Sequence, residues 1–299
     1  MKKAIVGILN NPAVSKNSHS AGMVEIVSRL FEADIITHLD DWNNYDELII
    51  YHGTNFRPGS YNIMGGLNGE IFQRAQKLID YKGKVNSLDG FQLNDFSIKR
   101  KIHTFDNFKN IDLINLPERD NIVIGDSHSI SVWPNESYTI SRNDGKTLHG
   151  FLKLNYDLSH YNNIIFYFGN IDLRFHLARQ SDPINATKDL FNRYIEYASK
   201  YNCIITQLLP VEHESRKIPQ SGQYKKSNFF GSKELRKELR NIANEIISNS
   251  GLEYIEWPKE YLNEDGDLLF DVMEPKQSVH LRPLFYTRNY KKQLNLFNL

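Results

Sequence analysis

The sequence predicts an α/β protein with two units, each built on a mostly parallel sheet. Short apolar runs typical of buried strands alternate with segments that have the apolar spacing of amphipathic helices. This alternation covers the first part of the chain and starts again at Asn121. Between the two stretches, from Asp89 to Arg119, the periodicity fades, which indicates a connector or a peripheral helix. We therefore expect one domain over residues 1–115 and a second over residues 116–299.

The first half contains four candidate strands and two candidate helices. The strands are expected at Ala4–Leu9, Ala33–Thr37, Glu47–Tyr51 and Lys84–Leu88, and the helices at Ala21–Phe31 and Gly69–Tyr81. The second helix is strongly amphipathic, and Gly83 is placed to end it. Because strands that alternate with helices are joined by crossovers, we expect them to run parallel.

The second half repeats this pattern. Its strands are expected at Asn121–Ile124, Ile164–Phe168, Cys203–Leu208 and Leu252–Ile255, and its helices at Ala186–Tyr201 and Gly231–Ser250. Pro210 ends the third of these strands, and Gly251 ends the long charged helix. Both halves therefore predict an open α/β sheet.

Composition excludes several classes of protein. The 299 residues carry 36 basic and 36 acidic side chains, a balance that does not favour nucleic acid as a partner. A single cysteine, Cys203, excludes an intrachain disulfide and a cysteine-rich zinc site. No apolar run approaches the ~18 residues of a membrane-spanning helix. The run Met1–Leu9 is too short for a signal peptide, so we expect a cytoplasmic protein.

The segment Gly125-Asp126-Ser127-His128-Ser129 directly follows a predicted buried strand. A serine in this position lies at the edge of the sheet where ligands bind in open α/β folds. Its hydroxyl is a weak nucleophile unless a neighbouring base accepts its proton. The alternative is that Ser127 only caps the N-terminus of a helix.

Three further blocks follow Ser127 in the sequence. They are the turn Asn143–Thr147, the strand Phe166–Phe168 that runs into polar residues up to Arg174, and Val279-His280-Leu281 near the C-terminus. In this order the four blocks resemble the SGNH (GDSL-type) hydrolase family over about residues 120–283. The strand–helix pattern predicts two Rossmann-like or flavodoxin-like units, and the resemblance implies that the C-terminal one is an SGNH-like three-layer α/β/α domain. It also implies Ser127 as nucleophile, His280 as general base, and Gly145 or Gly150 as a donor to the oxyanion.

The third block differs from the usual Gly-x-Asn-Asp of the family. Here the run is Gly169-Asn170-Ile171-Asp172, so Ile171 stands where the oxyanion asparagine is expected. The neighbouring Asn170 could replace that donor. The run is similar to a Phe-Gly-Glu-Ile-Asp-x-Arg variant of SGNH-like proteins tied to polysaccharide biology.

The last block lacks the aspartate of the family's Asp-x-x-His pattern. Gln277 stands three residues before His280, and an amide cannot serve as an anionic partner. Asp271 or Glu274 could fold back onto His280, and Asp271 is the residue we assign to the site.

Substrate or oxyanion binding is expected from residues of the first, second and third blocks. These residues are Gly145, Gly169, Asn170, Asp172, Arg174, Asp126 and His128. On a strand, Asp172 and Arg174 would face the same side, where a structural salt bridge is the alternative role. His128 and His176 lack a zinc-type ligand spacing, so no metal or cofactor is expected.

The function expected from the resemblance is that of a serine esterase or acyltransferase, independent of metal, that acts on an ester or an acylated carbohydrate. Two alternatives remain open. In the N-terminal half, the layout of Asn44–Ile50, Asn55-Phe56, Gly65-Gly66 and Tyr81–Lys84 is similar to the first half of phage DNA β-glucosyltransferases. That likeness implies a two-domain glycosyltransferase acting on a glycan or modified DNA. The other alternative is an inactive SGNH domain that binds carbohydrate. We expect a small-molecule or carbohydrate partner, rather than nucleic acid or a membrane.

Overall fold

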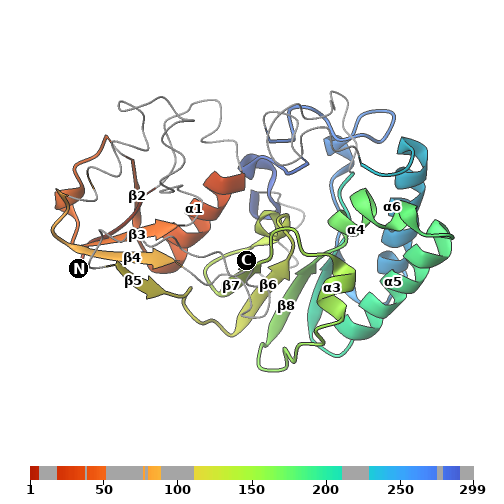
Figure 1. Ribbon diagram of the computed structural model, residues 1–299, viewed down its shortest axis with the longest axis horizontal. Coiled ribbons are helices and arrows are strands. Elements are labelled where there is room, and N and C mark those ends of the chain that lie inside the picture. The colour runs from red at the N-terminus through yellow and green to blue at the C-terminus, as the bar shows by residue number, and fades with distance from the viewer. Residues whose placement is uncertain are drawn as a thin grey trace. The chain divides into compact units, whose positions relative to one another are not determined.

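The computed structural model describes residues 1–6, 19–37, 39–51, 77, 80–88, 111–210, 229–274 and 279–289. The chain divides into two compact units, Met1–Glu118 and Arg119–Leu299 (Figure 1). The predicted boundary lies between residues 115 and 116. Each unit holds a sheet of five strands, and all the strand pairs described within these sheets are parallel. The predicted α/β class with two mostly parallel sheets is confirmed.

The sheet of the first unit has the strand order β2-β1-β3-β4-β5. Its elements are β1 (Lys3–Val6), α1 (His19–Phe31), β2 (Asp34–Ile36), the 3-10 turn η1 (Trp42–Asn44), β3 (Glu47–Tyr51), β4 (Lys84–Leu88) and β5 (Ile111–Ile114). Alternate apolar side chains of the strands, among them Ala4, Val6 and Leu48, form one buried cluster with Trp42. The hydrophobic effect of this burial stabilises the unit.

One predicted connector of this unit contains a strand, and one predicted helix lies mostly outside the described residues. The stretch Asp89–Arg119 was expected to be a connector or a helix, but Ile111–Ile114 forms β5 and pairs with β4. The run is only four residues long and contains Asp112, so its period-2 pattern is too brief to detect in the sequence. Most of the predicted helix Gly69–Tyr81 lies outside the described residues, as do Asn55-Phe56 and Gly65-Gly66.

The sheet of the second unit has the order β10-β9-β8-β6-β7. Its strands are β6 (Asn121–Gly125), β7 (Tyr138–Arg142), β8 (Asn163–Tyr167), β9 (Cys203–Thr206) and β10 (Glu253–Ile255). Its helices are α3 (Leu148–Leu152), α4 (Asn170–Phe175), α5 (Pro183–Ala198) and α6 (Lys233–Ser248), with 3-10 turns η6 (Ser129–Val132), η7 (Leu177–Arg179), η8 (Lys259–Tyr261), η9 (Pro283–Phe285) and η10 (Thr287–Asn289). Helices α3 to α6 gather on one side of this sheet (Figure 1).

The long helices α5 and α6 begin at side chains that cap their first turns. Asp182 accepts the Asn185 N–H at the start of α5, and Ser232 accepts the Leu235 N–H at the start of α6. These oxygens satisfy backbone donors that have no partner inside a helix. Both helices were predicted, and their observed ends lie a few residues from the predicted ones.

The predicted strand Ile164–Phe168 is observed as β8, but Asp172 and Arg174, which were considered as neighbours on a strand, lie in a helix. Strand β8 ends at Tyr167, and Asn170–Phe175 forms helix α4. Gly169 precedes the helix with a left-handed φ of 108°, a conformation that favours glycine and that breaks the strand. Asp172 and Arg174 therefore do not share one face of a strand.

Gly169 also packs closely against the core. A Cβ atom at this position would lie 2.8 Å from Phe191 Cζ and 3.1 Å from Leu208 Cδ2. We expect Gly169→Ala to lower the free energy of unfolding by about 2–4 kcal/mol, since backbone strain and overpacking add. Gly251→Ala is the control, because its φ of 77° brings the same strain with no atom within 4 Å. Equal losses in urea unfolding of both variants would show that the Phe191 contact is unimportant.

The strand order places a ligand site in the second unit. Counted along this unit, the first strand (β6) lies between the second (β7) and the third (β8), so the order of strands reverses between β6 and β8. In open α/β sheets, ligands bind outside the carboxyl ends of the strands at this switch point. The residues after Gly125 and after Tyr167, which are opposite each other in register, lie at that point.

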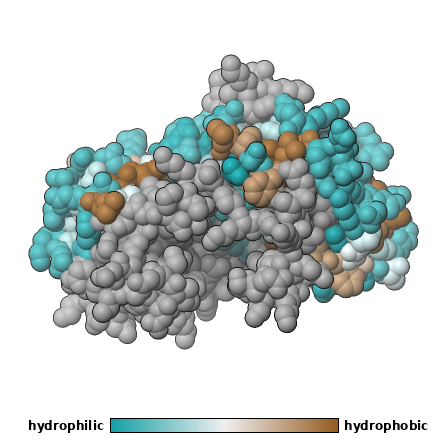
Figure 2. Space-filling view, turned by 90° about the horizontal axis from the view of Figure 1, so that it is seen from above, coloured by the Kyte–Doolittle hydropathy of each residue, from teal (hydrophilic) through white to brown (hydrophobic). Residues whose placement is uncertain are grey.

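The surface of the described residues is mixed in character. Among the residues coloured in Figure 2, hydrophilic ones predominate and apolar ones form small separate patches. The large apolar side chains exposed are Ile35, Leu39, Leu154, Phe230, Phe270 and Leu284, besides the N-terminal Met1. Apolar side chains scattered in this way are normal for a protein surface. No helix among the described residues has the length and apolar character needed to cross a membrane.

Candidate active site

Ser127 and His280 meet at the switch point of the second sheet. The Ser127 Oγ lies 2.7 Å from the His280 Nε2, although the two residues are 153 positions apart in the sequence. At this distance the serine hydroxyl can donate its proton to the imidazole, which is the geometry of a nucleophile with its general base. The structure therefore brings together the two residues that the motif order singled out.

The backbone after β6 turns so that Ser127 is only half-buried. Gly125 lies against β8, where a Cβ atom would be 2.3 Å from the carbonyl oxygen of Tyr167. The Asp126 N–H donates to the same carbonyl oxygen at 3.0 Å. The 3-10 turn η6 starts at Ser129 with His128 in the N-cap position. The alternative role of Ser127 as a helix cap is therefore wrong.

His280 is held by a short antiparallel pairing near the C-terminal end. Met273 and Leu281 form a bridge, and the Glu274 N–H donates to the His280 carbonyl at 2.7 Å. This register places the Glu274 Oε2 3.5 Å from the His280 Nδ1. Glu274 is 8% exposed, so its carboxylate is poorly screened from the imidazole. The site thus contains serine, histidine and a carboxylate in series.

Asp271, the residue assigned as the acidic partner, does not lie beside His280. Its side chain is 90% exposed, and its Oδ1 lies 4.0 Å from the Arg282 Nη2. In the antiparallel pairing, Glu274 stands opposite His280 while Asp271 lies beyond the paired residues. Glu274 replaces Asp271 as the acidic candidate, and Gln277 lies outside the described residues.

Two backbone N–H groups, those of Ser127 and Gly145, are candidate donors for an oxyanion. Neither the Ser127 N–H nor the Gly145 N–H donates to a protein acceptor among the described residues. Gly145 lies in an exposed turn after β7, with a φ of 78°. The second choice, Gly150, donates its N–H to the Thr147 Oγ1 at 2.9 Å, so this N–H already has an acceptor. Ser127 and Gly145 are the better candidates.

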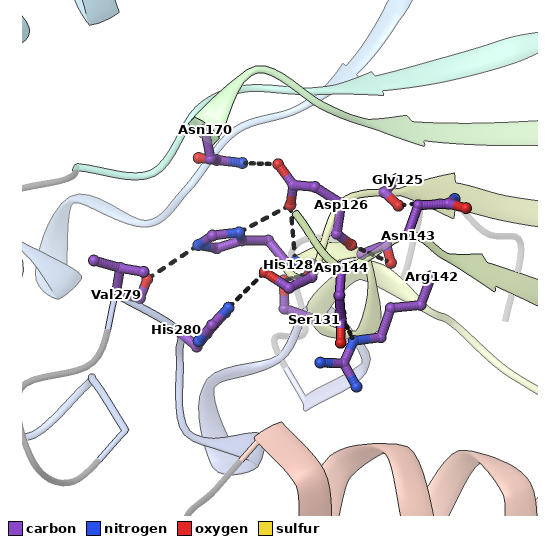
Figure 3. Close-up of polar contacts among 12 residues, drawn as sticks. Gly125, Asp126, His128, Ser131, Arg142, Asn143, Asp144, Asn170, Val279 and His280 are labelled. Carbon is purple, nitrogen blue, oxygen red and sulfur yellow. Dashed lines mark hydrogen bonds and ion pairs between the residues drawn. The ribbon is translucent and has the colours of Figure 1, made fainter. Parts of the chain in front are cut away.

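The side-chain amide of Asn170 faces Asp126, so it does not replace the missing oxyanion donor of the family. Its Nδ2 points to the Asp126 Oδ2 at 3.5 Å, the outer limit of a hydrogen bond (Figure 3). The side chain is 1% exposed. Ile171, at the position of the family asparagine, supplies no donor.

Asp126 and His128 form a buried pair beneath Ser127. The His128 Nδ1 lies 2.9 Å from the Asp126 Oδ1, and its Nε2 lies 3.2 Å from the carbonyl oxygen of Val279 (Figure 3). Burial lowers the pKa of the His128 imidazole, against the raising effect of the Asp126 carboxylate. Both side chains were expected to bind substrate, whereas in the structure they contact protein groups.

The other predicted binding residues also contact the protein itself. The Asp172 carboxylate accepts the N–H groups of Leu148 and His149 at 2.6 and 3.3 Å and so anchors the first turn of α3. Arg174 donates from its Nε to the Asn170 carbonyl at 3.0 Å, and its guanidinium lies 5.7 Å from the ring centre of Phe175. Asp172 therefore joins α4 to α3, and Arg174 bonds within α4.

Asp172 gives a prediction for stability as a function of pH. Burial raises the pKa of its carboxyl from 3.8 to about 6, so the folded protein binds this proton more tightly than the unfolded chain. The contribution to stability is present below pH 3.8 and is lost as the pH rises to about 6.

We expect the wild type to lose roughly 2–3 kcal/mol relative to Asp172→Asn between pH 4 and pH 7, since one pKa unit corresponds to ~1.4 kcal/mol. Urea unfolding of both proteins across this range measures the difference. If the difference in the free energy of unfolding between the two proteins stays constant with pH, the raised pKa of the Asp172 carboxyl is contradicted.

Within the described residues, no group of three or more His, Cys, Asp or Glu side chains is arranged to hold a metal ion.

No protein-family model matches the sequence, and the search of curated proteins finds no match. Among solved structures, the chain is similar to one described as a candidate platelet activating factor from Streptococcus pneumonia. That match has 18% identity and a TM-score of 0.44, and covers 61% of this chain and 85% of the other. A lipase/acylhydrolase from Enterococcus faecalis matches with 16% identity and a TM-score of 0.30, over 51% of this chain and 88% of the other. Likenesses at these values do not determine the reaction, which is inferred from the geometry of the site.

Proposed function

We propose that this chain is a serine esterase or acyltransferase that acts on an ester or an acylated carbohydrate. The observation that carries the proposal is the 2.7 Å contact between the Ser127 Oγ and the His280 Nε2 at the switch point of a parallel sheet. The order of the sequence blocks, which resembles the SGNH family, supports the same assignment and the carbohydrate substrate.

In the first step, the Ser127 Oγ attacks the ester carbonyl carbon while the His280 Nε2 takes the hydroxyl proton. The carbonyl π electrons move to the oxygen, and the N–H groups of Ser127 and Gly145 stabilise this oxyanion. Glu274, 3.5 Å from the Nδ1, stabilises the imidazolium that forms.

The tetrahedral intermediate then collapses and the bond to the leaving alcohol breaks. His280 returns its proton to the alkoxide, so an acyl-Ser127 and a free alcohol result. Water or another hydroxyl compound, deprotonated by His280, attacks the acyl group and regenerates Ser127. Hydrolysis and acyl transfer differ only in this second acceptor.

Hydrolysis of p-nitrophenyl acetate, p-nitrophenyl butyrate and an O-acetylated sugar by the wild-type protein tests the proposal. We expect repeated turnover that saturates with substrate. The heat-denatured protein is the control. If none of the three esters is turned over above that control, the proposed function is wrong.

A further inference from the structure

The two proposed reacting residues are flanked by residues that bond to one another. Ser127 lies between Asp126 and His128, and His280 directly follows Val279. The His128 ring bridges these two flanks, since its Nδ1 faces Asp126 and its Nε2 faces the Val279 carbonyl oxygen (Figure 3). One side chain thus connects the loop of the nucleophile with the segment of the base.

The bridge is buried and geometrically defined. Asp126 has no exposed surface and His128 is 3% exposed, so water competes poorly for the contact between them, while the contact with Val279 is part-buried. The Asp126 Oδ1 also accepts the backbone N–H of His128 at 2.9 Å, which fixes the carboxylate within its own turn. Asn170 approaches the other carboxylate oxygen from α4.

Both contacts of the ring require protons. A carbonyl oxygen only accepts, so the His128 Nε2 carries a hydrogen that it donates to Val279. The Nδ1 lies 2.9 Å from the Asp126 Oδ1, so a hydrogen lies between these two atoms as well. A side chain without a donor at the Nε2 position would not make the hydrogen bond to the Val279 carbonyl.

The same ring also touches the proposed general base. The ring centres of His128 and His280 are 4.5 Å apart with the planes tilted by 39°. The edge of His128 meets Tyr167 at 5.8 Å, so the ring is held from β8 as well. Its position limits how the His280 ring can turn.

We propose that His128 is a positioning residue that holds His280 at hydrogen-bond distance from Ser127, an inference that rests on the proposed function. It acts through the bond to the Val279 carbonyl and through the ring contact, and does not touch the substrate. A displacement of about 1 Å between reacting groups can cost about 10²-fold in rate.

Three substitutions of His128 separate the effect of its hydrogen bond to Val279 from the effect of its ring contact with His280. His128→Phe keeps a ring but has no donors, His128→Gln places an amide donor within reach of Val279, and His128→Asn keeps a polar group toward Asp126 but is too short for Val279. We expect kcat for p-nitrophenyl acetate to fall about 30- to 100-fold in His128→Phe and His128→Asn, with KM within threefold of the wild type. The kcat of His128→Gln should be at least about tenfold higher than that of His128→Asn.

Circular dichroism and thermal unfolding establish which variants fold, and the Asn and Gln pair carries the test if the Phe variant does not. A folded His128→Phe with kcat within threefold of the wild type would overturn the proposal. Equal losses in the Gln and Asn variants would also overturn it, because packing alone would then explain the effect.

Crystal structures of the Asn and Gln variants keep this test apart from that of the proposed function. We expect the distance from the Ser127 Oγ to the His280 Nε2 to exceed hydrogen-bond range in His128→Asn and to return in His128→Gln. If the wild type hydrolyses no ester, the proposed function fails, and these distances still decide whether His128 positions His280. An unchanged distance in both variants contradicts the positioning role.

Discussion

Ser127→Ala is expected to lower kcat for ester hydrolysis by at least about 10⁴-fold, while the protein stays folded. The substitution removes the atom that forms the acyl bond, the hydroxyl oxygen that lies 2.7 Å from the His280 Nε2. Residual activity comes from oxyanion stabilisation and binding alone. Initial rates with p-nitrophenyl acetate measure the effect.

The matched control is Ser137→Ala in the same unit. Ser137 is exposed, and its hydroxyl bonds to the Asn135 side chain, so its removal should leave kcat within twofold. Because Ser127 and His280 act as a unit, the double variant Ser127→Ala/His280→Ala should be no less active than Ser127→Ala. Ester hydrolysis that persists in Ser127→Ala would remove Ser127 from the role of nucleophile.

Glu274→Gln is expected to lower kcat by about 10²- to 10³-fold with little change in KM. The glutamine amide can donate to the His280 Nδ1, which favours the tautomer with a proton on the Nε2. That tautomer cannot accept the proton of Ser127. The loss should be smaller than that for a tightly bonded aspartate, because the Glu274 Oε2 lies 3.5 Å from the Nδ1.

Asp271→Asn is the control for this prediction, since Asp271 is the acidic residue that the sequence favoured. Its side chain is 90% exposed and faces Arg282, so the substitution should leave kcat within twofold. If Asp271→Asn loses as much activity as Glu274→Gln, the carboxylate assignment made from the structure is wrong.

The pairing of Ser127 with His280 could be predicted because the strand pattern and the order of the sequence blocks single out both residues. Ser127 directly follows a buried apolar strand, and His280 occurs in the order of blocks that the family resemblance provides. Parallel strands end at the same sheet edge, so the strand pattern alone places Ser127 where ligands bind.

The acidic partner could not be chosen from the sequence, because the choice depends on a register. Asp271 and Glu274 both precede His280, and only the bridge between Met273 and Leu281 places one of them opposite the imidazole. A pairing of two isolated residues leaves no periodic pattern that a reader of the sequence could detect.

The contact between His128 and Val279 could not be predicted from the sequence for a different reason. The partner of the His128 Nε2 is the carbonyl of Val279, a backbone group that every residue carries. No side-chain motif marks such a contact. The roles of Asp172 and Arg174 were misjudged because the residues after Gly169, which has a left-handed φ, form helix α4.

The central claim is that Ser127 is a nucleophile activated by His280. Its most direct test is the reaction of the wild-type protein with a serine-directed fluorophosphonate, followed by mass spectrometry of the peptides. We predict that the label forms on Ser127 with loss of fluoride, and that it fails to form in His280→Ala on the same timescale. Labelling of a different residue, or labelling of Ser127 at an unchanged rate without His280, would contradict the claim.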